Sequence, residues 1–435
     1  MNTVDKHVVV IGAGPMGLMT AWSLAKAGVR VTLLEEGAVP GGMSACFSWH
    51  GEMLERFYHF FNLPDLHFLQ ALDELGIRDK LQWTPTKMGF YMDGTLFPWS
   101  DPIALLRFPK LSLVSRLRYG FHMLHVKRQD NLRPLDEVRL AEWLVKWEGR
   151  ACYDMLWRPL LEKKFFELAD PLSAAWIATR IRRVARSRTS LFEERLAYLE
   201  GGCQVLIDAL LGRLHKLDAS VRCNENVLRV ERRENKCLVT SRTSELSCDG
   251  VISTIPLPYV SNMIPQLDEV YRTQLNEVNN IGVACVLLRL KKPLTNNFWL
   301  NINMPSWDIP GIIEYSNLRP LPWSLLYIPF YMPSTHPNWR AEDAALLSKA
   351  VSYVRHIGKH LAEDDIIEGK VGRYSYAQPV CPPGFSRKIP SYETGLPGVL
   401  VADTTHSYPE DRSINESFRI GKELADKFLA GIVVS

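Results

Sequence analysis

A glycine-rich stretch near the start of the chain, VVVIGAGPMG over residues 8–17, constrains the fold more than any other feature. Its run of four apolar residues is typical of a buried strand in a parallel sheet. Gly12, Gly14 and Gly17 follow with G-x-G-x-x-G spacing, and a helical pattern occupies residues 18–27. The first glycine allows a tight turn, the second lets the backbone approach a pyrophosphate, and the third lets helix and strand pack closely. The stretch therefore predicts a dinucleotide site at a helix N-terminus.

An acidic residue follows the second predicted strand, which comes after the helix. Residues 31–34, VTLL, are typical of a second strand, and Glu35 follows them, 23 residues after Gly12. At this distance from the glycine loop, a carboxylate is expected to bind the ribose hydroxyl groups. Glu36 is the alternative acid, although it lies one residue beyond the apolar run. A glycine turn without a ligand is the other interpretation, but the strand, helix, second strand and acid together favour a nucleotide site.

Composition excludes several classes of protein. At 435 residues, 46% of them hydrophobic and 23% charged, the chain has the make-up of a folded protein with two domains or one elaborate one. A net charge of +3 does not indicate a nucleic-acid partner. Eight scattered cysteines without a C-x-x-C pair predict neither a metal site nor a dithiol centre, and free thiols are typical of a reducing compartment. No apolar run approaches the ~20 residues that span a bilayer, and the first strand leaves no room for a signal peptide, so we expect a cytoplasmic protein.

Downstream of Glu35 the chain resembles a known family. The loop GAVPGG over residues 37–42 follows the acid directly. With this loop and the preceding strand, the chain is similar to the flavin-containing amine oxidase superfamily and, within it, to the protoporphyrinogen-oxidase-like branch. In that family a Gly-Gly pair lies against FAD, and Gly41 and Gly42 match it. The next residue of the family is usually arginine, whereas this chain has Met43.

The C-terminal stretch carries the second part of the resemblance. An apolar strand over residues 398–403 ends at Asp403, which matches the family's aspartate on the ribityl-phosphate side of FAD. A helix then begins near Ile414 and Asn415, and the resemblance implies that its N-terminus faces the flavin and stabilises negative charge there. Val227 matches the family's valine whose backbone contacts the adenine. The resemblance and the glycine loop together predict these FAD-binding residues: Gly12, Gly14, Pro15, Met16, Gly17, Glu35, Glu36, Gly41, Gly42, Met43, Val227, Asp403, Ile414 and Asn415.

The predicted fold class is α/β, with a Rossmann-type FAD-binding domain that contains a parallel sheet, plus a discontinuous α+β substrate domain. The FAD-binding domain is expected over residues 1–84, 196–275 and 390–435, and the substrate domain over residues 85–195 and 276–389. The first part of the substrate domain is expected to be helical, with helices over residues 138–147 and 151–168. The second part is expected to supply a sheet and one helix over residues 341–361, with strands over residues 283–290, 299–303, 312–315, 325–331 and 370–377.

Hydride transfer to a flavin needs a reacting carbon held in a water-poor pocket rather than a sequence-local triad. Glu314, between apolar neighbours on a predicted strand, is the expected general base, because burial raises a carboxyl pKa towards neutrality. An outward-facing strand residue is the alternative. Tyr376 is expected opposite it, and Tyr315 and Tyr331 are expected to line the substrate pocket. No lysine can be assigned to the flavin, and Cys381 is out of register with the family's covalent cysteine, so FAD is expected to bind non-covalently.

Two basic segments predict further contacts. Arg182 and Arg186 share one helix face and are predicted to bind a carboxylate or phosphate of the substrate, with a solvated face as the alternative. Residues 105–128 carry six basic residues and no acid, with apolar residues at helical spacing. That pattern suits a helix on an anionic membrane surface, and it also suits a solvated helix packed on its own domain.

These features predict an FAD-dependent oxidoreductase of biosynthesis that oxidises or desaturates a mainly apolar small molecule by removing a hydride. Oxygen or another acceptor would reoxidise the flavin. A non-redox flavoenzyme resembling UDP-galactopyranose mutase is one alternative, because the diphosphate of its substrate requires arginines. A binding protein that retains FAD without turnover is the other. Consumption of an electron acceptor distinguishes the oxidoreductase from both.

Overall fold

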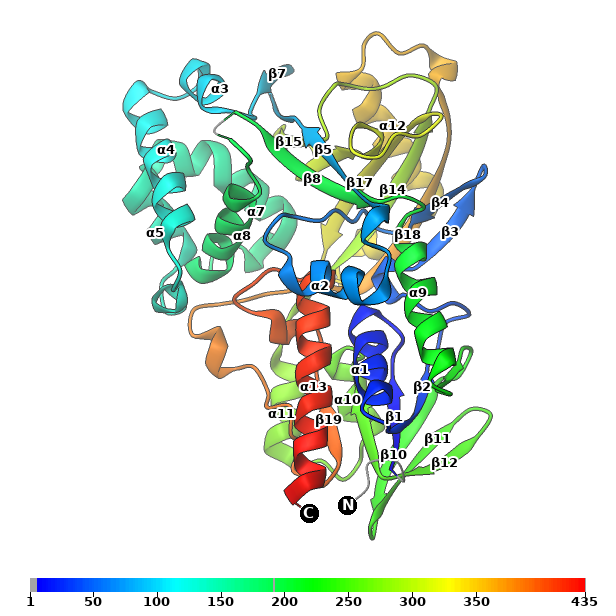
Figure 1. The fold of residues 1–435 in the computed structure, drawn as a ribbon. Helices are drawn as coiled ribbons and strands as arrows, with labels where there is room; N and C mark the ends of the chain where they lie inside the picture. Colours follow the sequence, from blue (N-terminus) through cyan, green and yellow to red (C-terminus); the bar gives the residue numbers. More distant parts are fainter. Residues whose placement is uncertain (1–5, 191, 435) are drawn as a thin grey trace.

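The computed structural model describes residues 6–190 and 192–434, and the lower half of the molecule in Figure 1 is built on a five-stranded parallel sheet. Its strand order is β19–β13–β1–β2–β9. In chain order these strands are β1 (His7–Ile11), β2 (Arg30–Leu34), β9 (Ser220–Arg222), β13 (Gly250–Ser253) and β19 (Val399–Val401). Because β1 is the central strand, the glycine loop that follows it lies in the middle of the carboxyl edge of the sheet, where nucleotides bind in such folds.

Both faces of β1 are buried, which explains its unbroken apolar run. Val8 and Val10 belong to the core formed with helices α1 (Pro15–Lys26), α9 (Cys203–Lys216) and α13 (Ile414–Val434). Val9 and Ile11 belong to a second core on the other side of the sheet. That core includes the meander β10 (Val227–Arg233), β11 (Lys236–Ser241) and β12 (Glu245–Cys248), and helices α10 (Leu257–Met263) and α11 (Glu269–Glu277).

A seven-stranded sheet forms the upper right of the molecule in Figure 1, in the order β18–β14–β17–β16–β15–β6–β7. Helix α12 (Asp343–Ile357) packs on one face of it through Leu346 and Tyr353. The strands expected over residues 283–331 and 370–377 are present, within a few residues of the predicted limits. The bounds are β6 (Met88–Met92), β7 (Thr95–Pro98), β14 (Asn280–Leu290), β15 (Trp299–Asn303), β16 (Gly311–Glu314), β17 (Ser324–Met332) and β18 (Ile366–Pro379).

A helical insertion occupies the upper left of Figure 1. Its helices are α3 (Pro102–Arg107), α4 (Leu113–Arg128), α5 (Leu140–Glu148), α6 (Arg150–Cys152), α7 (Arg158–Phe165) and α8 (Ala174–Arg186). The single helix expected over residues 151–168 is interrupted, because a π-helical turn at Tyr153–Trp157 separates α6 from α7. Pro159 lies in the first turn of α7 and has no backbone N–H to donate, which accounts for the break.

The stretch that contains β6, β7 and the helical insertion leaves and rejoins the rest of the chain at one place. Strand β5 (Leu81–Thr86) pairs antiparallel with β8 (Glu194–Leu199), and Thr86 lies opposite Glu194. Short strands β3 (Cys46–Trp49) and β4 (Glu52–Glu55) form a separate hairpin, and α2 (Leu66–Leu75) packs on α13. The boundaries of the two expected domains stay a prediction.

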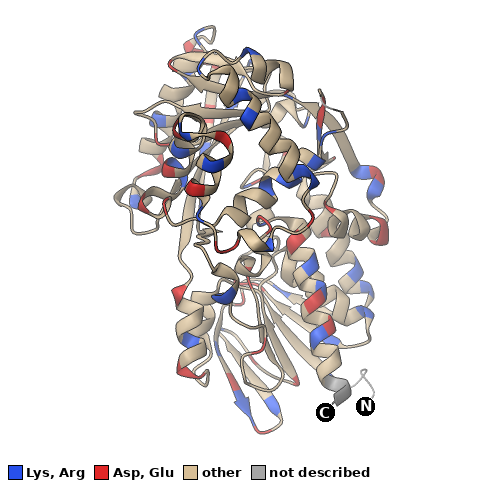
Figure 2. Cartoon of the chain, turned by 90° about the vertical axis from the view of Figure 1, so that its left-hand side faces the viewer, with Lys and Arg blue, Asp and Glu red and all other residues tan. Residues whose placement is uncertain are grey.

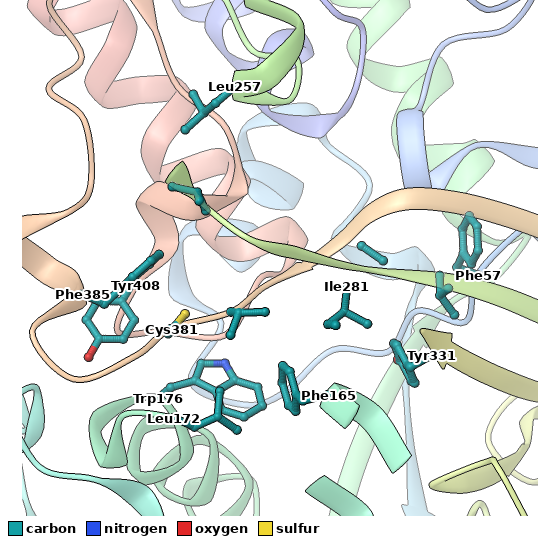
Figure 3. Packing of buried hydrophobic residues seen from close by; sticks show 14 of the residues in the cluster. Phe57, Phe165, Leu172, Trp176, Leu257, Ile281, Tyr331, Cys381, Phe385 and Tyr408 are labelled. Atoms are coloured by element: carbon teal, nitrogen blue, oxygen red, sulfur yellow. The ribbon is translucent and has the colours of Figure 1, made fainter. Parts of the chain in front are cut away.

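The three parts meet in a shared core around β14 and β18. In Figure 3 Phe165 of the insertion lies between Trp176 of α8 and Tyr331 of β17, and Ile281 of β14 is close by. The Phe165 and Trp176 rings pack edge to face with centroids 5.2 Å apart. Across the described residues, no helix has the length and apolar character to cross a membrane, and all eight cysteines are free.

Candidate active site

A cavity of about 1430 Å³ extends from the glycine loop of β1 to the helical insertion. This volume exceeds the roughly 300–1,000 Å³ of a typical small-molecule pocket. Its walls come from the β1–α1 turn, from β14, β17 and β18 of the large sheet, and from α4, α7 and α8 of the insertion. One cavity therefore joins the predicted nucleotide site to a space large enough for a second molecule.

Glycines form the nucleotide end of this cavity. Gly12 has φ +96°, a conformation that residues with side chains rarely adopt. A Cβ on Gly17 would lie 1.8 Å from the carbonyl oxygen of Gly12, so this glycine is required by helix packing. A Cβ on Gly14 would have its nearest neighbour, the Cα of Gly42, at 4.0 Å. Gly14 and Gly42 both line the cavity, so the absence of a side chain at Gly14 leaves room in the cavity rather than in the core.

The predicted acid is fixed beside the loop. Glu35 accepts a hydrogen bond from the backbone N–H of Ala13 through Oε2 at 2.7 Å and one from Gly37 through Oε1 at 2.8 Å. Glu36 accepts one from the side-chain amide of Asn226 at 3.1 Å. Both carboxylates line the cavity together with Val227. The two candidate acids and the predicted adenine contact thus lie on one wall.

The C-terminal motif closes the opposite side of this end. Asp403 accepts hydrogen bonds from the backbone N–H of Thr405 at 2.8 Å and of Leu257 at 3.2 Å, and it lines the cavity with Ile414. The side chain of Asn415 is turned away, since its Oδ1 accepts a hydrogen bond from the N–H of Phe68 on α2. Of the predicted nucleotide residues, Pro15, Met16 and Met43 also line the cavity, whereas Gly17, Gly41 and Asn415 are not among its described lining residues.

A polar cluster lies next to this motif, formed by Tyr58, Lys164, Tyr331, Gln378 and Arg412. The Nζ of Lys164 donates to Oε1 of Gln378 at 3.1 Å, and Nη1 of Arg412 donates to the same oxygen at 2.7 Å. The hydroxyls of Tyr58 and Tyr331 lie 3.3 Å apart. Arg412 precedes Ile414 by two residues, so the shared amide of Gln378 places Lys164 near the N-terminus of α13.

Lys164 is enclosed by aromatic rings. Its Nζ lies 5.1 Å from the ring centroids of both Trp176 and Tyr331, and 5.3 Å from that of Phe165. Burial, reinforced by the nearby positive charge of Arg180, holds the pKa of this amine well below its usual range. The neutral amine is the form that accepts a proton.

Two aspartates pair the arginines of this wall. Arg183 binds Asp65 through two hydrogen bonds of 2.9 and 2.8 Å, and Arg180 lies 3.4 Å from Asp411. Burial alone would raise the pKa of Asp411, but the charges around it, led by Arg180, lower it to about 2. All four side chains line the cavity, and each arginine already has a carboxylate partner.

Comparison with known proteins identifies the family. The sequence profile of the family described as flavin containing amine oxidoreductase matches residues 17–427, which is nearly the whole chain. The chain belongs to this family. Membership implies a flavin cofactor, and the cavity described above has the walls for one.

Curated relatives of this flavin family member include desaturases. The chain is 25% identical over 317 residues to 15-cis-phytoene desaturase of an Oncidium hybrid cultivar, which covers 67% of this chain and 54% of the relative. It is 25% identical over 303 residues to phytoene desaturase of Fusarium fujikuroi, covering 61% of this chain and 52% of the relative. The chain thus spans about half the length of the curated relatives it matches.

Solved structures share the fold across their whole length. A candidate protoporphyrinogen oxidase from Exiguobacterium sp. 255-15 superposes with a TM-score of 0.76 at 18% identity, covering 98% of this chain and 99% of the other. Putrescine oxidase with bound putrescine gives 0.70 at 15% identity, with 98% and 99% coverage. A fatty acid isomerase from P. acnes gives 0.70 at 16% identity, with the same coverage. These similarities confirm the predicted α/β fold.

The predicted general base of this family member is in the wrong place. Glu314 is fully buried, as expected, but it does not border the described cavity. Its carboxylate accepts hydrogen bonds from the N–H groups of Leu294 and Thr295, both at 2.8 Å, and from the hydroxyl of Ser324 at 2.9 Å. Both faces of β16 are buried, so burial did not distinguish the cavity side from the other. Glu314 holds a turn together.

Three further site predictions meet different outcomes. Tyr331 lines the cavity as expected, whereas Tyr315 does not belong to its described lining. Tyr376 also lines the cavity, but Glu314, which it was expected to face across the pocket, does not. The hydroxyl of Tyr315 donates to the backbone oxygen of His59 at 3.0 Å, within the core. The prediction of a substrate contact for Tyr315 is therefore wrong.

The predicted arginine pair lies on the wrong face of α8. Arg182 donates to the backbone oxygen of Asp130 at 2.7 Å and pairs with Glu410 at 2.5 Å. Arg186 pairs with Asp130 at 2.7 Å. These two side chains hold α8 to the end of α4, while Arg180 and Arg183, on a neighbouring face, point to the cavity. Helical spacing showed that Arg182 and Arg186 share a face of this helix but not whether that face is directed towards the cavity.

The sequence also gave no role to Lys164 or Glu194. Glu194 lines the cavity at the start of β8, is 3% exposed, and its Oε1 has no hydrogen-bond partner among the described residues. Burial raises its pKa to about 7, partly offset by Arg188. Lys164 lies in the stretch WRPLLEKKF, residues 157–165, which contains no motif with a known spacing. Neither residue has a local pattern that sequence analysis could have recognised.

Proposed function

We propose that this chain is an FAD-dependent oxidoreductase that oxidises or desaturates a mainly apolar small molecule and binds FAD without a covalent bond. The observation that carries the proposal is the single cavity that joins the glycine loop to the aromatic and polar space beneath the insertion. A cofactor and a substrate that share one cavity can be held in contact.

The nucleotide end fits FAD. Gly14 and Gly42 leave space that a pyrophosphate would fill, and Glu35, fixed by two backbone N–H groups, retains free lone pairs for a ribose hydroxyl. Asp403 and the N-terminus of α13 would hold the flavin side. When bound, FAD supplies the acceptor for a hydride.

The other end suits an apolar substrate. Its described walls include Trp299 and Tyr58, which pack edge to face at 5.6 Å, and Val283 and Cys285 of β14. Relatives named phytoene desaturases favour the removal of hydrogen from a carbon–carbon bond. Polar groups also line this space, among them Lys164 of the polar cluster, the paired Arg180 and Arg183, and Glu194.

Desaturation removes a proton as well as a hydride, and we propose Lys164 as the group that accepts the proton. Its amine lies in the cavity wall, its burial favours the neutral form, and Gln378 fixes its position. Tyr331, whose ring lies against the same amine, would orient the substrate beside it. Glu314 has no part in this proposal.

The mutase alternative is less favoured. A nucleoside diphosphate substrate requires positive charge that is free to bind it. Arg182 and Arg186 are used elsewhere, and Arg180 and Arg183 are each paired with an aspartate inside the cavity.

Purification of the full chain tests the proposal. The protein should be yellow, and acid or heat should release its flavin into solution as FAD. Mixed without oxygen with a panel of apolar polyene, fatty and isoprenoid substrates, it should lose its oxidised-flavin absorbance with at least one of them. A colourless protein that also fails to bind added FAD would exclude the proposal. If the protein converts a substrate only when its flavin is already reduced, with no net electron transfer, the mutase alternative is favoured.

A further inference from the structure

An ordinary surface helix buries its apolar stripe against the core. Helix α4 differs, because most of its large apolar side chains are exposed. Its buried residues are His122 and Val126, and His122 is held by a 2.8 Å hydrogen bond with Glu148. Five large apolar side chains of the same helix are instead exposed, by 44% to 65%: Leu113, Val114, Leu117, Phe121 and Leu124. Four of them recur at intervals of three or four residues, so they form one stripe facing outwards.

Helix α3 extends this stripe with Ile103 and Leu106, also exposed. We call the seven residues the apolar rim: Ile103, Leu106, Leu113, Val114, Leu117, Phe121 and Leu124. They make up seven of the sixteen large hydrophobic side chains that are exposed in the described part of the chain, within a stretch of 22 positions. Contiguous exposed apolar surface of this kind marks an interaction site rather than chance exposure.

Positive charge surrounds the apolar rim. No acidic residue occurs between Pro102 and Gln129, while this stretch contains Arg107, Lys110, Arg116, Arg118, Lys127 and Arg128. Arg116 and Arg118 donate to backbone carbonyls, which leaves their net charge uncompensated, and Lys110 pairs with Asp93. Figure 2 turns this side of the molecule toward the viewer, with Lys and Arg in blue. This face is therefore complementary to a partner surface that is apolar inside and negatively charged at its edge.

The cavity opens at the apolar rim. Leu106, Leu117, Phe121 and Leu124 are exposed to solvent and also line the cavity. The same lining includes Arg116 and Lys127, the basic residues beside them. An apolar molecule that leaves this mouth therefore meets the apolar rim before it meets water.

We infer that the apolar rim inserts into an anionic lipid surface, and that the cavity takes its substrate directly from the lipid. A membrane with negative headgroups offers both the apolar interior and the charge that this face fits. The transfer of substrate from lipid rests on the proposed function, whereas the docking itself does not. A second copy of the chain is the competing occupant, but two such faces would bring their basic borders together.

Sedimentation of the full, flavin-loaded chain with vesicles tests the docking. Binding is expected to vesicles in which about one third of the phosphatidylcholine is replaced by phosphatidylglycerol, and to be at least fivefold weaker to phosphatidylcholine alone. Leu117→Glu with Phe121→Glu should weaken binding to the anionic vesicles by tenfold or more, because charges enter the lipid. Arg107→Gln with Arg128→Gln should weaken it about tenfold and remove most of the lipid selectivity.

Val270→Glu is the matched control, because Val270 of α11 is exposed by 71% and lies on the nucleotide half. It should bind vesicles as the wild type does. Unchanged binding of the Leu117→Glu, Phe121→Glu protein, or loss of binding in the control alone, would overturn the inference. If the wild type is a dimer without lipid and the Leu117→Glu, Phe121→Glu protein is a monomer, the inference is overturned in favour of self-association.

Photo-crosslinking locates the contact. Vesicles containing a phosphatidylcholine with a diazirine at the end of one acyl chain should label peptides that contain residues 113–124. Label confined to other surfaces would refute the placement. Both experiments need neither substrate nor turnover, so a failure of the proposed oxidoreductase activity would leave their outcome unchanged.

Discussion

The two ends of the cavity differ in what forms their walls. At the nucleotide end part of the wall is backbone, from the turn after β1 and from Gly42, and its shape depends on missing side chains. At the insertion end the wall is made of large side chains from α4, α7 and α8, and its chemistry depends on which faces of those helices turn inwards. The nucleotide end therefore suits a single ligand, the cofactor. The chemistry of the insertion end depends on which side chains the helices direct into the cavity.

The largest expected effect concerns the glycines. Gly14→Val should leave the protein folded but without FAD, because the new side chain enters the cavity, where a Cβ meets no atom closer than 4.0 Å. Absorbance near the flavin bands and thermal unfolding of the same sample measure the two properties. Gly17→Val is the control for position: its Cβ would clash with Gly12 at 1.8 Å, so this variant should not fold. Full flavin occupancy in Gly14→Val would show that the pyrophosphate of FAD does not bind at Gly14.

At the insertion end, Lys164→Met should slow flavin reduction by substrate roughly 10²-fold or more, the typical effect of a lost acid–base group. FAD content should be unchanged, because Lys164 lies away from the glycine loop. Stopped-flow absorbance under anaerobic conditions measures the rate.

The adjacent Lys163 provides a matched control for that experiment. It donates to the backbone oxygens of Ile302 and Met304 and is not part of the described cavity lining. Lys163→Met should lower stability and leave the reduction rate within about twofold. Equal rates in the two variants would remove Lys164 from the proton transfer.

Glu194 should make stability depend on pH. Its folded-state pKa of about 7 lies above its ordinary 4.5, so the folded protein holds the proton more tightly. Stability from this group is therefore complete below about pH 4.5 and decreases as pH rises to about 7, by roughly 3 kcal/mol. Glu194→Gln should match the wild type near pH 4.5 and exceed it by up to that amount at pH 8, in urea unfolding. Glu193→Gln, at the partly exposed neighbouring position, should show no such gain.

The smallest effect is expected for Arg182→Ala with Arg186→Ala. Because both side chains bind residues 127–130 and Glu410 rather than the cavity, kcat and KM should stay within about twofold of the wild type. Thermal unfolding should occur at a lower temperature, since α8 loses these hydrogen bonds and ion pairs to the end of α4 and to Glu410. A selective rise in KM for an anionic substrate would restore these arginines to the substrate site.

The same contrast explains what the sequence could predict. The glycine loop and Glu35 could be predicted because they depend on a local spacing along the chain, and Gly42 and Asp403 because the chain resembles a known family there. Gly12, Gly14, Glu35, Gly42 and Asp403 all line the cavity. The strands of the large sheet were predicted because apolar runs show them, and β15 occupies residues 299–303 as expected.

Side-chain direction at the insertion end could not be predicted in the same way. Glu314 lies on a strand buried on both faces, so alternation carried no information about its side. Lys164 depends on Gln378 and Trp176, which lie 214 and 12 positions away along the chain, and no local pattern records such contacts. The orientation of α4 was likewise open, because its pattern fits both a membrane surface and packing on its own domain.

The pairing of β5 with β8 has a consequence for how such proteins diversify. Because Thr86 and Glu194 lie opposite one another, the stretch between them, which carries β6, β7 and the helical insertion, begins and ends at one point of the remaining structure. Closing a long segment costs little more entropy than closing a shorter one, so its length is only weakly constrained. Helices could be added, lost or exchanged there without disturbing the glycine loop. The helical insertion, and with it the substrate preference, can therefore be exchanged in evolution or by design while the residues proposed to bind FAD stay unchanged.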